Sequence, residues 1–193
     1  FYDVERTDLF ERVSLDLAAF YNDYEALRTF DPEVLPPPVL GFPFDNRLEG
    51  SARGLEAALQ WRPTPDWRIE GTYSYLDLDL RRVGGSRDVL SESAEQSSPR
   101  HQATLSSLVT LRPGLEWDTM LRYVDEIDTP RGGVPAYLAL DLRLGIEVDR
   151  NVSISVAGRN LLDDHHPEFH PDFIETQGTE VERSVHVSLR WRF

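Results

Sequence analysis

The hydrophobic pattern of this chain has a period of two, and this feature constrains the fold most strongly. In segment 184–193 every odd position is apolar and every even position is polar. A β-strand sends successive side chains to opposite faces, whereas a helix would scatter the same residues around its circumference. The segment therefore predicts a strand with one apolar face and one polar face.

The same alternation recurs in seven more segments. They are residues 13–22, 55–61, 67–75, 101–112, 116–123, 138–148 and 152–157. Many of them run for about 9–12 residues, which exceeds the usual strand length of about 5–6 and approaches the length that crosses a bilayer when tilted. We interpret Phe1–Glu5 as the end of a ninth strand. The pattern predicts an all-β fold in which the strands form an antiparallel meander.

The connections between these strands fall into two kinds that alternate along the chain. Tight turns with proline, glycine, aspartate or asparagine are expected at Arg62–Asp66, Arg112–Gly114 and Asp149–Asn151. Long polar or proline-rich loops are expected at Arg28–Arg53, Arg81–Arg100, Asp125–Ala136 and Leu162–Arg183. Short periplasmic turns and long external loops alternate in this way in outer-membrane barrels.

The aromatic residues sort by strand end. All four tryptophans lie on the apolar stripe beside a short turn or in the last strand, whereas tyrosines lie on the same stripe at the opposite ends. The tryptophans are Trp61, Trp67, Trp117 and Trp191, and the tyrosines are Tyr21, Tyr73, Tyr75 and Tyr123. Two aromatic girdles around an apolar band are typical of a transmembrane barrel. The apolar stripe is therefore expected to face lipid, and the polar stripe to line the interior.

Composition excludes several other classes of protein. The net charge of −14 argues against a nucleic-acid-binding protein, and the lack of cysteine excludes disulfides, thiolate zinc sites and a thiol nucleophile. No apolar run of about 20 residues is present, so no membrane-spanning helix is expected. The chain has neither a Gly-x-Ser-x-Gly elbow nor a phosphate loop. We predict no enzymatic activity and no cofactor.

Several segments resemble a known family in the correct order. The closing strand 184–193 resembles the terminal strand of outer-membrane proteins, and 156–164 resembles the penultimate strand of TonB-dependent receptors. Segments 15–24, 55–65 and 67–75 resemble earlier strands of that family. The chain thus resembles the C-terminal β-barrel portion of a TonB-dependent outer-membrane receptor. The resemblance implies a transmembrane antiparallel meander β-barrel, of which residues 1–193 form one part.

The resemblance also implies a function and a set of partners. It implies TonB-coupled uptake of a scarce nutrient across the outer membrane, such as an iron–siderophore complex, cobalamin or a glycan. The implied partners are outer-membrane lipid, the receptor's own plug domain, TonB through that plug, and the barrel-assembly machinery. The plug and the N-terminal strands are absent from this chain. Trp191 and Phe193 match the assembly signal of the last strand.

Candidate site residues follow from this interpretation. The inward-facing arginines expected to hold the plug are Arg68, Arg122, Arg143, Arg159, Arg190 and Arg192. The loop residues expected to contact substrate are Phe42, Phe44, His165, His166 and His170. Asp163 and Asp164 stand beside these histidines, but the spacing matches no tight ligand motif, so we predict no metal site.

Three alternatives remain open at this point. The first is a small stand-alone outer-membrane barrel of eight strands that acts as a passive pore or adhesin. The second is an outer-membrane hydrolase, which needs a Ser/His/acid cluster near the barrel rim. The third is a soluble barrel that carries a ligand and turns its apolar stripe inward.

Overall fold

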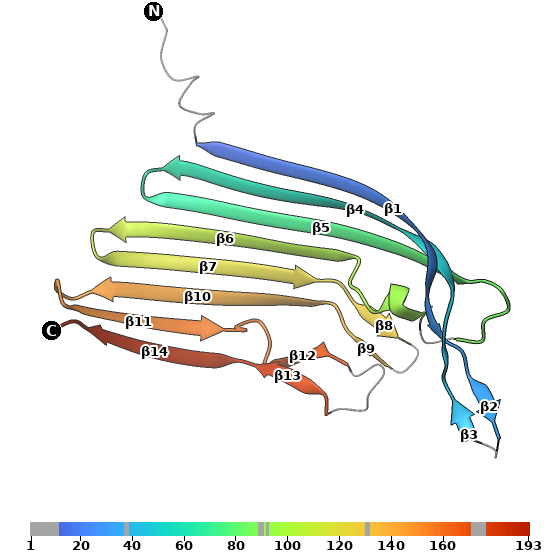
Figure 1. Ribbon diagram of the computed structural model, residues 1–193. Coiled ribbons are helices and arrows are strands. Elements are labelled where there is room, and N and C mark those ends of the chain that lie inside the picture. The colour runs from blue at the N-terminus through green and yellow to red at the C-terminus, as the bar shows by residue number, and fades with distance from the viewer. Residues whose placement is uncertain (1–11, 37–38, 89–90, 92, 130–131, 171–176) are drawn as a thin grey trace, which may run out of the picture.

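Eight long strands form one antiparallel sheet in the computed structural model, which describes residues 12–36, 39–88, 91, 93–129, 132–170 and 177–193 (Figure 1). Their order in the sheet is β1-β4-β5-β6-β7-β10-β11-β14. The strands are β1 (Val13–Phe30), β4 (Phe44–Thr64), β5 (Trp67–Arg82), β6 (His101–Arg112), β7 (Leu115–Val124), β10 (Tyr137–Glu147), β11 (Val152–Arg159) and β14 (Ser184–Trp191). Each long strand pairs with the next long strand along the chain, so the predicted all-β meander is confirmed.

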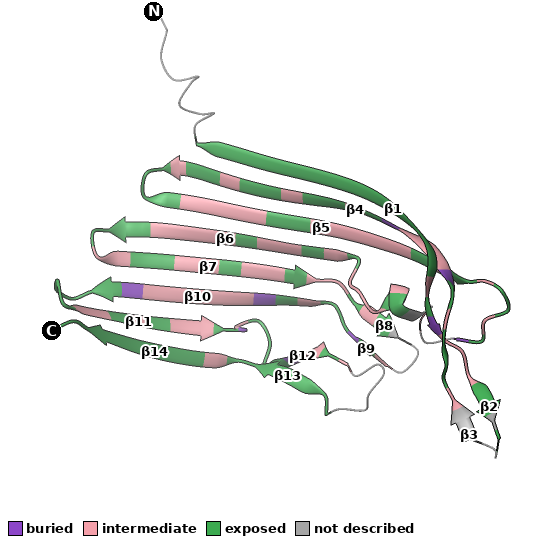
Figure 2. Ribbon diagram, viewed as in Figure 1, coloured by how far each residue is buried: buried purple, intermediate pink, exposed green. Residues whose placement is uncertain are grey.

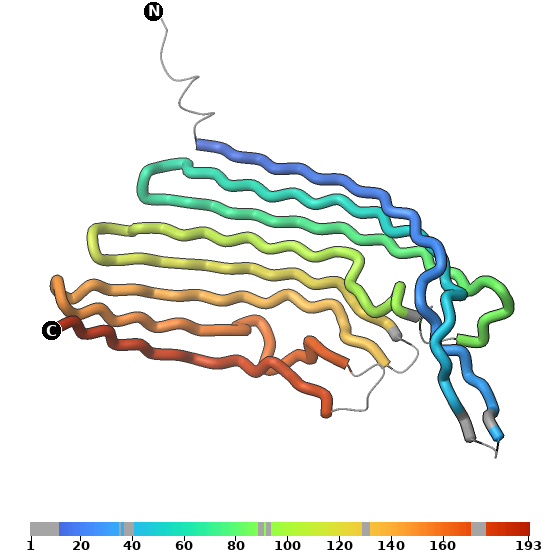
Figure 3. The backbone as a smooth tube through the Cα atoms, viewed as in Figure 1, coloured from blue at the N-terminus to red at the C-terminus, as the bar shows by residue number. Residues whose placement is uncertain are grey.

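The sheet is curved and open, as the course of the backbone shows (Figure 3). In the described part of the chain, β1 pairs with β4 alone and β14 pairs with β11 alone, so the two edge strands do not meet each other. An open curved sheet is the form expected for part of a larger barrel, because full closure would remove both edges. The proposed ninth strand at Phe1–Glu5 lies outside the described residues.

The alternation of short and long connections is confirmed. The turns β4–β5, β6–β7 and β10–β11 lie at one end of the sheet, on the left in Figure 1, and the long connections lie at the other end. Local chemistry explains the short turns. Gly114 adopts a φ of 77°, which a residue with a Cβ rarely adopts. The Asp149 carboxylate accepts hydrogen bonds from the backbone N–H groups of Asn151 (2.7 Å) and Val152 (2.9 Å).

The long connections contain regular structure that the sequence did not predict. Three of them fold into short hairpins, and the fourth holds a 3-10 turn. The hairpins are β2–β3 (Glu33–Leu35 and Val39–Gly41), β8–β9 (Ile127–Thr129 and Gly132–Val134) and β12–β13 (His165–Phe169 and Thr179–Glu182), and the turn is η1 (Ser93–Gln96). Among the described residues, these short strands pair only within their own hairpins.

The predicted loop Arg28–Arg53 is wrong for much of its length. β1 and β4 stay paired as far as Phe30 and Phe44, so both strands project beyond the rest of the sheet together with β5 (Figure 1). The apolar stripe changes face in this projection. The inward side chains become Phe20, Tyr24, Ala52, Leu76, Leu78 and Leu80, and the outward ones become Arg53, Glu49, Asp77, Asp79 and Arg81. A pattern that assumed one apolar face therefore ended the strands too early.

Burial is concentrated at the loop end. The buried hydrophobic residues among those described are Leu48, Ala52, Val134 and Ala139, and both faces of the sheet elsewhere are largely open (Figure 2). Val187 and Leu189 of β14 remain 72% and 67% exposed. Such a continuous exposed apolar face requires an apolar environment or a partner. No helix in the described part of the chain is long and apolar enough to cross a membrane.

Candidate functional site

The strand register defines two chemically distinct faces across the sheet. One row runs through Leu15, Leu59, Gly71, Leu105, Leu121 and Leu140. The adjacent row, on the opposite face, runs through Asp16, Ala58, Thr72, Thr104, Arg122 and Ala139. The apolar residues that alternate in the sequence thus lie on one continuous outer face, and the polar residues lie on the concave inner face.

Aromatic residues border the outer face at both ends. At the turn end, Trp61 and Trp67 lie with ring centroids 6.4 Å apart, and Trp67 shares a row with Val109 and Trp117. At the loop end, Tyr73, Tyr75, Tyr123 and His101 occupy the same face. The His101 Nδ1 atom lies 2.8 Å from the Tyr73 hydroxyl, and its ring centroid lies 5.1 Å from that of Tyr75. The sequence patterns did not identify His101.

Ion pairs mark where the apolar band of the outer face ends. Immediately beyond the row of Ala19, Leu55 and Tyr75, Arg53 lies 2.7 Å from Asp77 on the outer face. Further out, Arg81 lies 2.7 Å from Glu49. Charged side chains are costly against lipid, so this boundary limits the lipid-facing part of β1, β4 and β5. Phe20 belongs to the same reversal, because its side chain lies on the inner face. Its ring covers Gly54, where a Cβ would collide with it.

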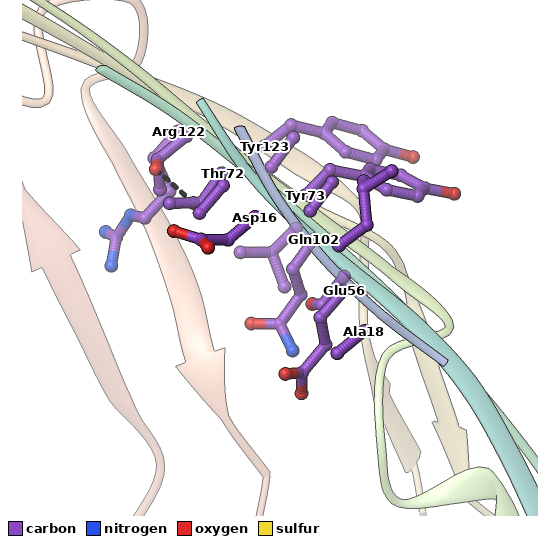
Figure 4. A pocket seen from close by; sticks show the side chains of 15 residues that line it. Asp16, Ala18, Glu56, Thr72, Tyr73, Gln102, Arg122 and Tyr123 are labelled. Atoms are coloured by element: carbon purple, nitrogen blue, oxygen red, sulfur yellow. Dashed lines mark hydrogen bonds between the residues drawn. The ribbon is translucent and has the colours of Figure 1, made fainter. Parts of the chain in front are cut away.

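A hollow of about 580 Å³ lies along the curved wall between β1 and β7 (Figure 4). Figure 4 shows Asp16, Glu56, Thr72, Gln102 and Arg122 on one side of the sheet, whereas Tyr73 and Tyr123 lie on the other. The inner side therefore offers carboxylates, hydroxyls, an amide and one guanidinium. This set suits water and polar solutes or a polar protein surface.

Three of the six predicted inward arginines form ion pairs with the wall or its loops. Arg143 bridges Glu116 (3.1 Å) and Asp118 (2.7 Å) of β7, because the register places Arg143 opposite Asp118. Arg68 lies 3.2 Å from Glu70. Arg122 lies 2.6 Å from Glu168, which belongs to β12. These contacts neutralise the three guanidinium groups within the chain itself.

The other three predicted arginines differ. The register places Arg159 and Arg190 on the inner face of β11 and β14, and Arg192 follows β14 with the same parity. Within the part of the chain that the structure describes, none of the three forms an ion pair. Among the described residues, the inner face thus carries arginines that form ion pairs within the chain and arginines that do not.

A compact cluster fastens the β12–β13 hairpin to the inner wall. His166 is 5% exposed, and its ring stacks on Tyr137 of β10 with centroids 4.3 Å apart. Its Nε2 atom lies 3.1 Å from the Glu168 carboxylate, which also accepts the hydrogen bond from Arg122. The Arg122 guanidinium lies 5.5 Å from the centre of the Tyr137 ring. β7, β10 and β12 therefore meet through these four side chains, which we call the hairpin anchor.

Asn160 provides a second attachment between the hairpin and the wall. This residue is 2% exposed and adopts a φ of 51°, in the left-handed region where asparagine is tolerated. Its backbone N–H donates to the Asp141 carboxylate (2.9 Å), and its side-chain amide donates to the Val181 carbonyl (3.0 Å). The end of β11 is thus tied to both β10 and β13.

The loop between β1 and β4 is tied to the loop after β5 by carboxylates. Asp31 accepts hydrogen bonds from the Arg87 backbone N–H (2.5 Å), the Ser86 hydroxyl (2.8 Å) and the Thr29 hydroxyl (2.9 Å). The Arg87 N–H, with smaller contributions from the Ser86 and Thr29 hydroxyls, lowers the pKa of the Asp31 carboxyl below its usual value. Buried Asp88 accepts from the Phe30 backbone N–H (2.6 Å).

Of the predicted substrate contacts, Phe42 and Phe44 lie at this first loop. Both are exposed, and Phe44 packs against Phe30 with ring centroids 5.0 Å apart. Arg28 lies over both rings of this pair. Phe44 also borders a hollow of about 360 Å³ lined by Asp31, Arg47 and Arg87. Aromatic and charged groups therefore converge here.

The three predicted histidine contacts do not form one group. His165 is exposed and lies 3.9 Å from Glu180, His166 is buried in the hairpin anchor, and His170 lies beside Gly132 of β9. In the described ranges, no three His, Asp or Glu side chains come together in a way that would hold a metal ion. The three histidines therefore lie in different surroundings within the loop region.

Sequence reasoning missed most residues that hold the loops. Tyr137, Glu168, Asn160 and Asp31 were not among the predicted site residues, and their partners lie between 2 and 56 positions away. Asn160 gives a weak local signal, because asparagine is enriched at positive φ.

The two-faced open sheet, its aromatic borders and its sorted connections define this chain as part of the wall of a transmembrane β-barrel. A family model described as "TonB dependent receptor-like, beta-barrel" matches residues 6–161. The chain belongs to this family, whose members are receptors and transporters rather than enzymes.

Comparisons with individual proteins agree. The chain is 24% identical over 162 residues to the probable TonB-dependent siderophore receptor PiuA of Acinetobacter baumannii, covering 78% of this chain and 22% of that protein. The crystal structure of PiuA is similar, with a TM-score of 0.72, 23% identity and coverage of 95% of this chain and 26% of PiuA. The ferric-catecholate import receptor Fiu from E. coli K12 gives a TM-score of 0.68, 20% identity and coverage of 94% and 25%. The chain thus spans about a quarter of the length of these relatives.

Proposed function

We propose that this chain is part of an outer-membrane receptor that takes up a scarce nutrient, such as an iron–siderophore complex, in a TonB-coupled step. The observation that carries the proposal is the family match over residues 6–161 together with the outer apolar and inner polar faces. The chemistry of this chain is then confined to binding and to lining a passage.

Residues 1–193 are proposed as the C-terminal part of the receptor barrel. Two observations support this assignment: the chain spans about a quarter of its relatives, and β1 and β14 each present an unpaired edge among the described residues. Further strands of the same protein would pair with these edges. The stand-alone barrel of eight strands is less favoured, because it would need β1 and β14 to pair with each other.

The siderophore class is favoured over cobalamin or glycans because the relatives described above are the siderophore receptor PiuA and the ferric-catecholate import receptor Fiu. The proposed ligand contacts remain Phe42, Phe44, His165, His166 and His170. The exposed Phe42, Phe44 and His165 are accessible to a ligand as they stand, whereas His166 would require the hairpin anchor to open.

The proposed partners follow from the two faces. Outer-membrane lipid covers the apolar face, and the barrel-assembly machinery binds the last strand through Trp191 and Phe193, which are both exposed. The plug domain fills the interior against the inner arginines and engages TonB. Such contacts must be strong enough to seal the barrel and weak enough to rearrange under force.

Iron-limited growth tests the proposed uptake. The full gene is expressed in a Gram-negative host that lacks its own siderophore receptors, and growth is measured on ferric catecholates, ferric hydroxamates and, separately, cobalamin. We expect growth on one iron complex, and we expect that growth to disappear when the host lacks TonB. Growth that persists without TonB, or no difference between the gene and an empty vector on every source, would contradict the proposal.

A further inference from the structure

Two arginines share one carboxylate on the outer face, at the loop end of the sheet. The Arg53 guanidinium of β4 lies against Asp77 of β5, with its Nε atom 2.8 Å and its Nη2 atom 2.7 Å from the Oδ2 atom. Arg100, immediately before β6, brings its Nη2 atom to 3.9 Å from the Oδ1 atom of the same carboxylate. We call Arg53, Asp77 and Arg100 the arginine clamp.

The arginine clamp carries one positive charge more than its carboxylate neutralises. The Asp77 side chain is 15% exposed, whereas those of Arg53 and Arg100 are 66% and 70% exposed. A guanidinium has five N–H donors, so contact with one carboxylate leaves each arginine with further donors. Asp77 thus holds two guanidinium groups together at the surface, and both can still bind a second anion.

The arginine clamp lies at the border of the lipid-facing surface. The adjacent row toward the turn end runs through Leu55, Tyr75 and His101, and the apolar band follows it. From Tyr75 to Asp77 is two residue steps along β5, or about 7 Å. Interfacial aromatic residues lie at the level of lipid headgroups, so the clamp is at or just beyond that level.

The charges further out confine the positive site to this height. The next row of the outer face holds Asp23 and Asp79 on either side of Ser51. Beyond it, Arg81 is matched by Glu49 at 2.7 Å. A dissolved anion that approaches from the loop end therefore meets carboxylates first, whereas an anion fixed to the membrane surface reaches the clamp from the lipid side.

We infer that the arginine clamp binds the phosphate group of an outer-leaflet lipid. Guanidinium groups bind phosphate through paired hydrogen bonds, and two of them around one site suit a group with several anionic oxygens. The headgroup then lies beside the rings of Tyr75 and His101, whose centroids are 5.1 Å apart, and the acyl chains cover the apolar band. The inference rests on the proposed outer-membrane location and adds one specific lipid site to it.

Native mass spectrometry of the full receptor in detergent tests this site. The probe is lipid A with both of its phosphate groups, and the comparison is the same lipid after both phosphates are removed. We expect the unmodified receptor to retain the phosphorylated form preferentially, and R53A/R100A to bind it at least tenfold more weakly. The matched control is R81A, because Arg81 is similarly exposed on the same face but is paired with Glu49, and its binding should stay within twofold. D79N removes a carboxylate that repels phosphate, so it should bind at least as strongly as the unmodified receptor.

Three results would overturn the inference. They are binding by R53A/R100A within twofold of the unmodified receptor, equal retention of the two lipid forms, and full displacement of lipid A by millimolar inorganic phosphate, which would indicate a site for a free anion. The comparison of the two lipid forms uses the unmodified receptor, so it does not depend on the folding of a variant. Iron uptake should persist in R53A/R100A, whereas absence of TonB-dependent uptake by the unmodified receptor is a failure of the proposed function alone.

Discussion

The hairpin anchor makes a quantitative prediction about the β12–β13 hairpin. In an E168Q variant, the carboxylate that lies 2.6 Å from Arg122 and 3.1 Å from His166 loses its charge but keeps its shape. The side chains of Glu168 and Arg122 are 29% and 39% exposed, so solvent weakens the pair without removing it. A fully exposed pair contributes about 0–1 kcal/mol and a charge-assisted hydrogen bond about 1.5–3 kcal/mol. We place this contact near 1.4 kcal/mol, which corresponds to about a tenfold change in an equilibrium constant.

Hydrogen exchange on the full receptor measures this change. Local opening exposes the amides of β12 and β13, so their exchange rates scale with the opening constant. We expect E168Q to raise exchange about tenfold in peptides covering 165–169 and 179–182, with no change in β6. The control is E180Q, because Glu180 lies 3.9 Å from His165 and both side chains are more than half exposed.

The double variant completes the test. If Arg122 and Glu168 act through each other, then R122M and E168Q together should raise exchange little more than E168Q alone, because contacting residues are not additive. Exchange in E168Q within twofold of the unmodified receptor, or additive effects of the two substitutions, would refute the assignment of the anchor.

Three further outcomes follow from the structure. The L121R substitution places a guanidinium on the outer face between Leu105 and Leu140, so we expect the free energy of unfolding in phospholipid vesicles to fall by about 2–4 kcal/mol. The S106R substitution on the inner face should lower it by less than about 1 kcal/mol. Equal losses would contradict the assignment of the two faces. Because the pKa of Asp31 is lowered, its carboxylate stabilises the loop contact fully above the ordinary pKa of about 3.9, and this stabilisation is lost as pH falls through the depressed pKa. The amides of residues 83–88 should therefore lose protection from exchange in acid. The D31N variant should lack that protection already at neutral pH and should show no acid transition in exchange rates corrected for pH. N160A should destabilise the hairpin by more than N160G, by about 1 kcal/mol in the same exchange assay, because both lose the bond to Val181 but glycine alone accommodates a φ of 51°; the reverse order would show that backbone conformation is not the constraint.

The period-two pattern predicted the membrane-spanning part of the fold well because one face of each strand has to stay apolar there. The segment predicted at 101–112 coincides with β6, and the segment at 67–75 begins where β5 begins. The pattern failed where the environment changes along a strand. Beyond the row of Ala19, Leu55 and Tyr75, the outer face carries Arg53 and Asp77. The alternation therefore continues with its polarity reversed and no longer matches a single stripe.

The loop contacts were beyond the reach of a local pattern for a different reason. The sequence predicts His166 as a loop residue that contacts substrate, but nothing near it in the sequence shows that Tyr137 of another strand would cover its ring. Likewise, His101 looks like an ordinary polar residue at a strand start until the register places it beside Tyr73 and Tyr75. Contacts of this kind depend on how hairpins fold back over the sheet.

Cross-strand register also explains why parity alone could not distinguish the inner arginines. Parity assigns a side chain to a face, but the register assigns its neighbours, and a slip of one residue would turn the whole strand over. Arg143 lies opposite Asp118, and Glu116 lies two residues before Asp118 on the same face of β7. Both carboxylates form ion pairs with Arg143, so its charge is neutralised within the wall. Arg190 lies opposite Ser153, and Arg159 lies opposite Ser184, so the same residue type on the same face keeps its charge available. Whether an inner arginine of this wall is neutralised by a neighbouring carboxylate is therefore a property of the pairing, which requires the assembled sheet.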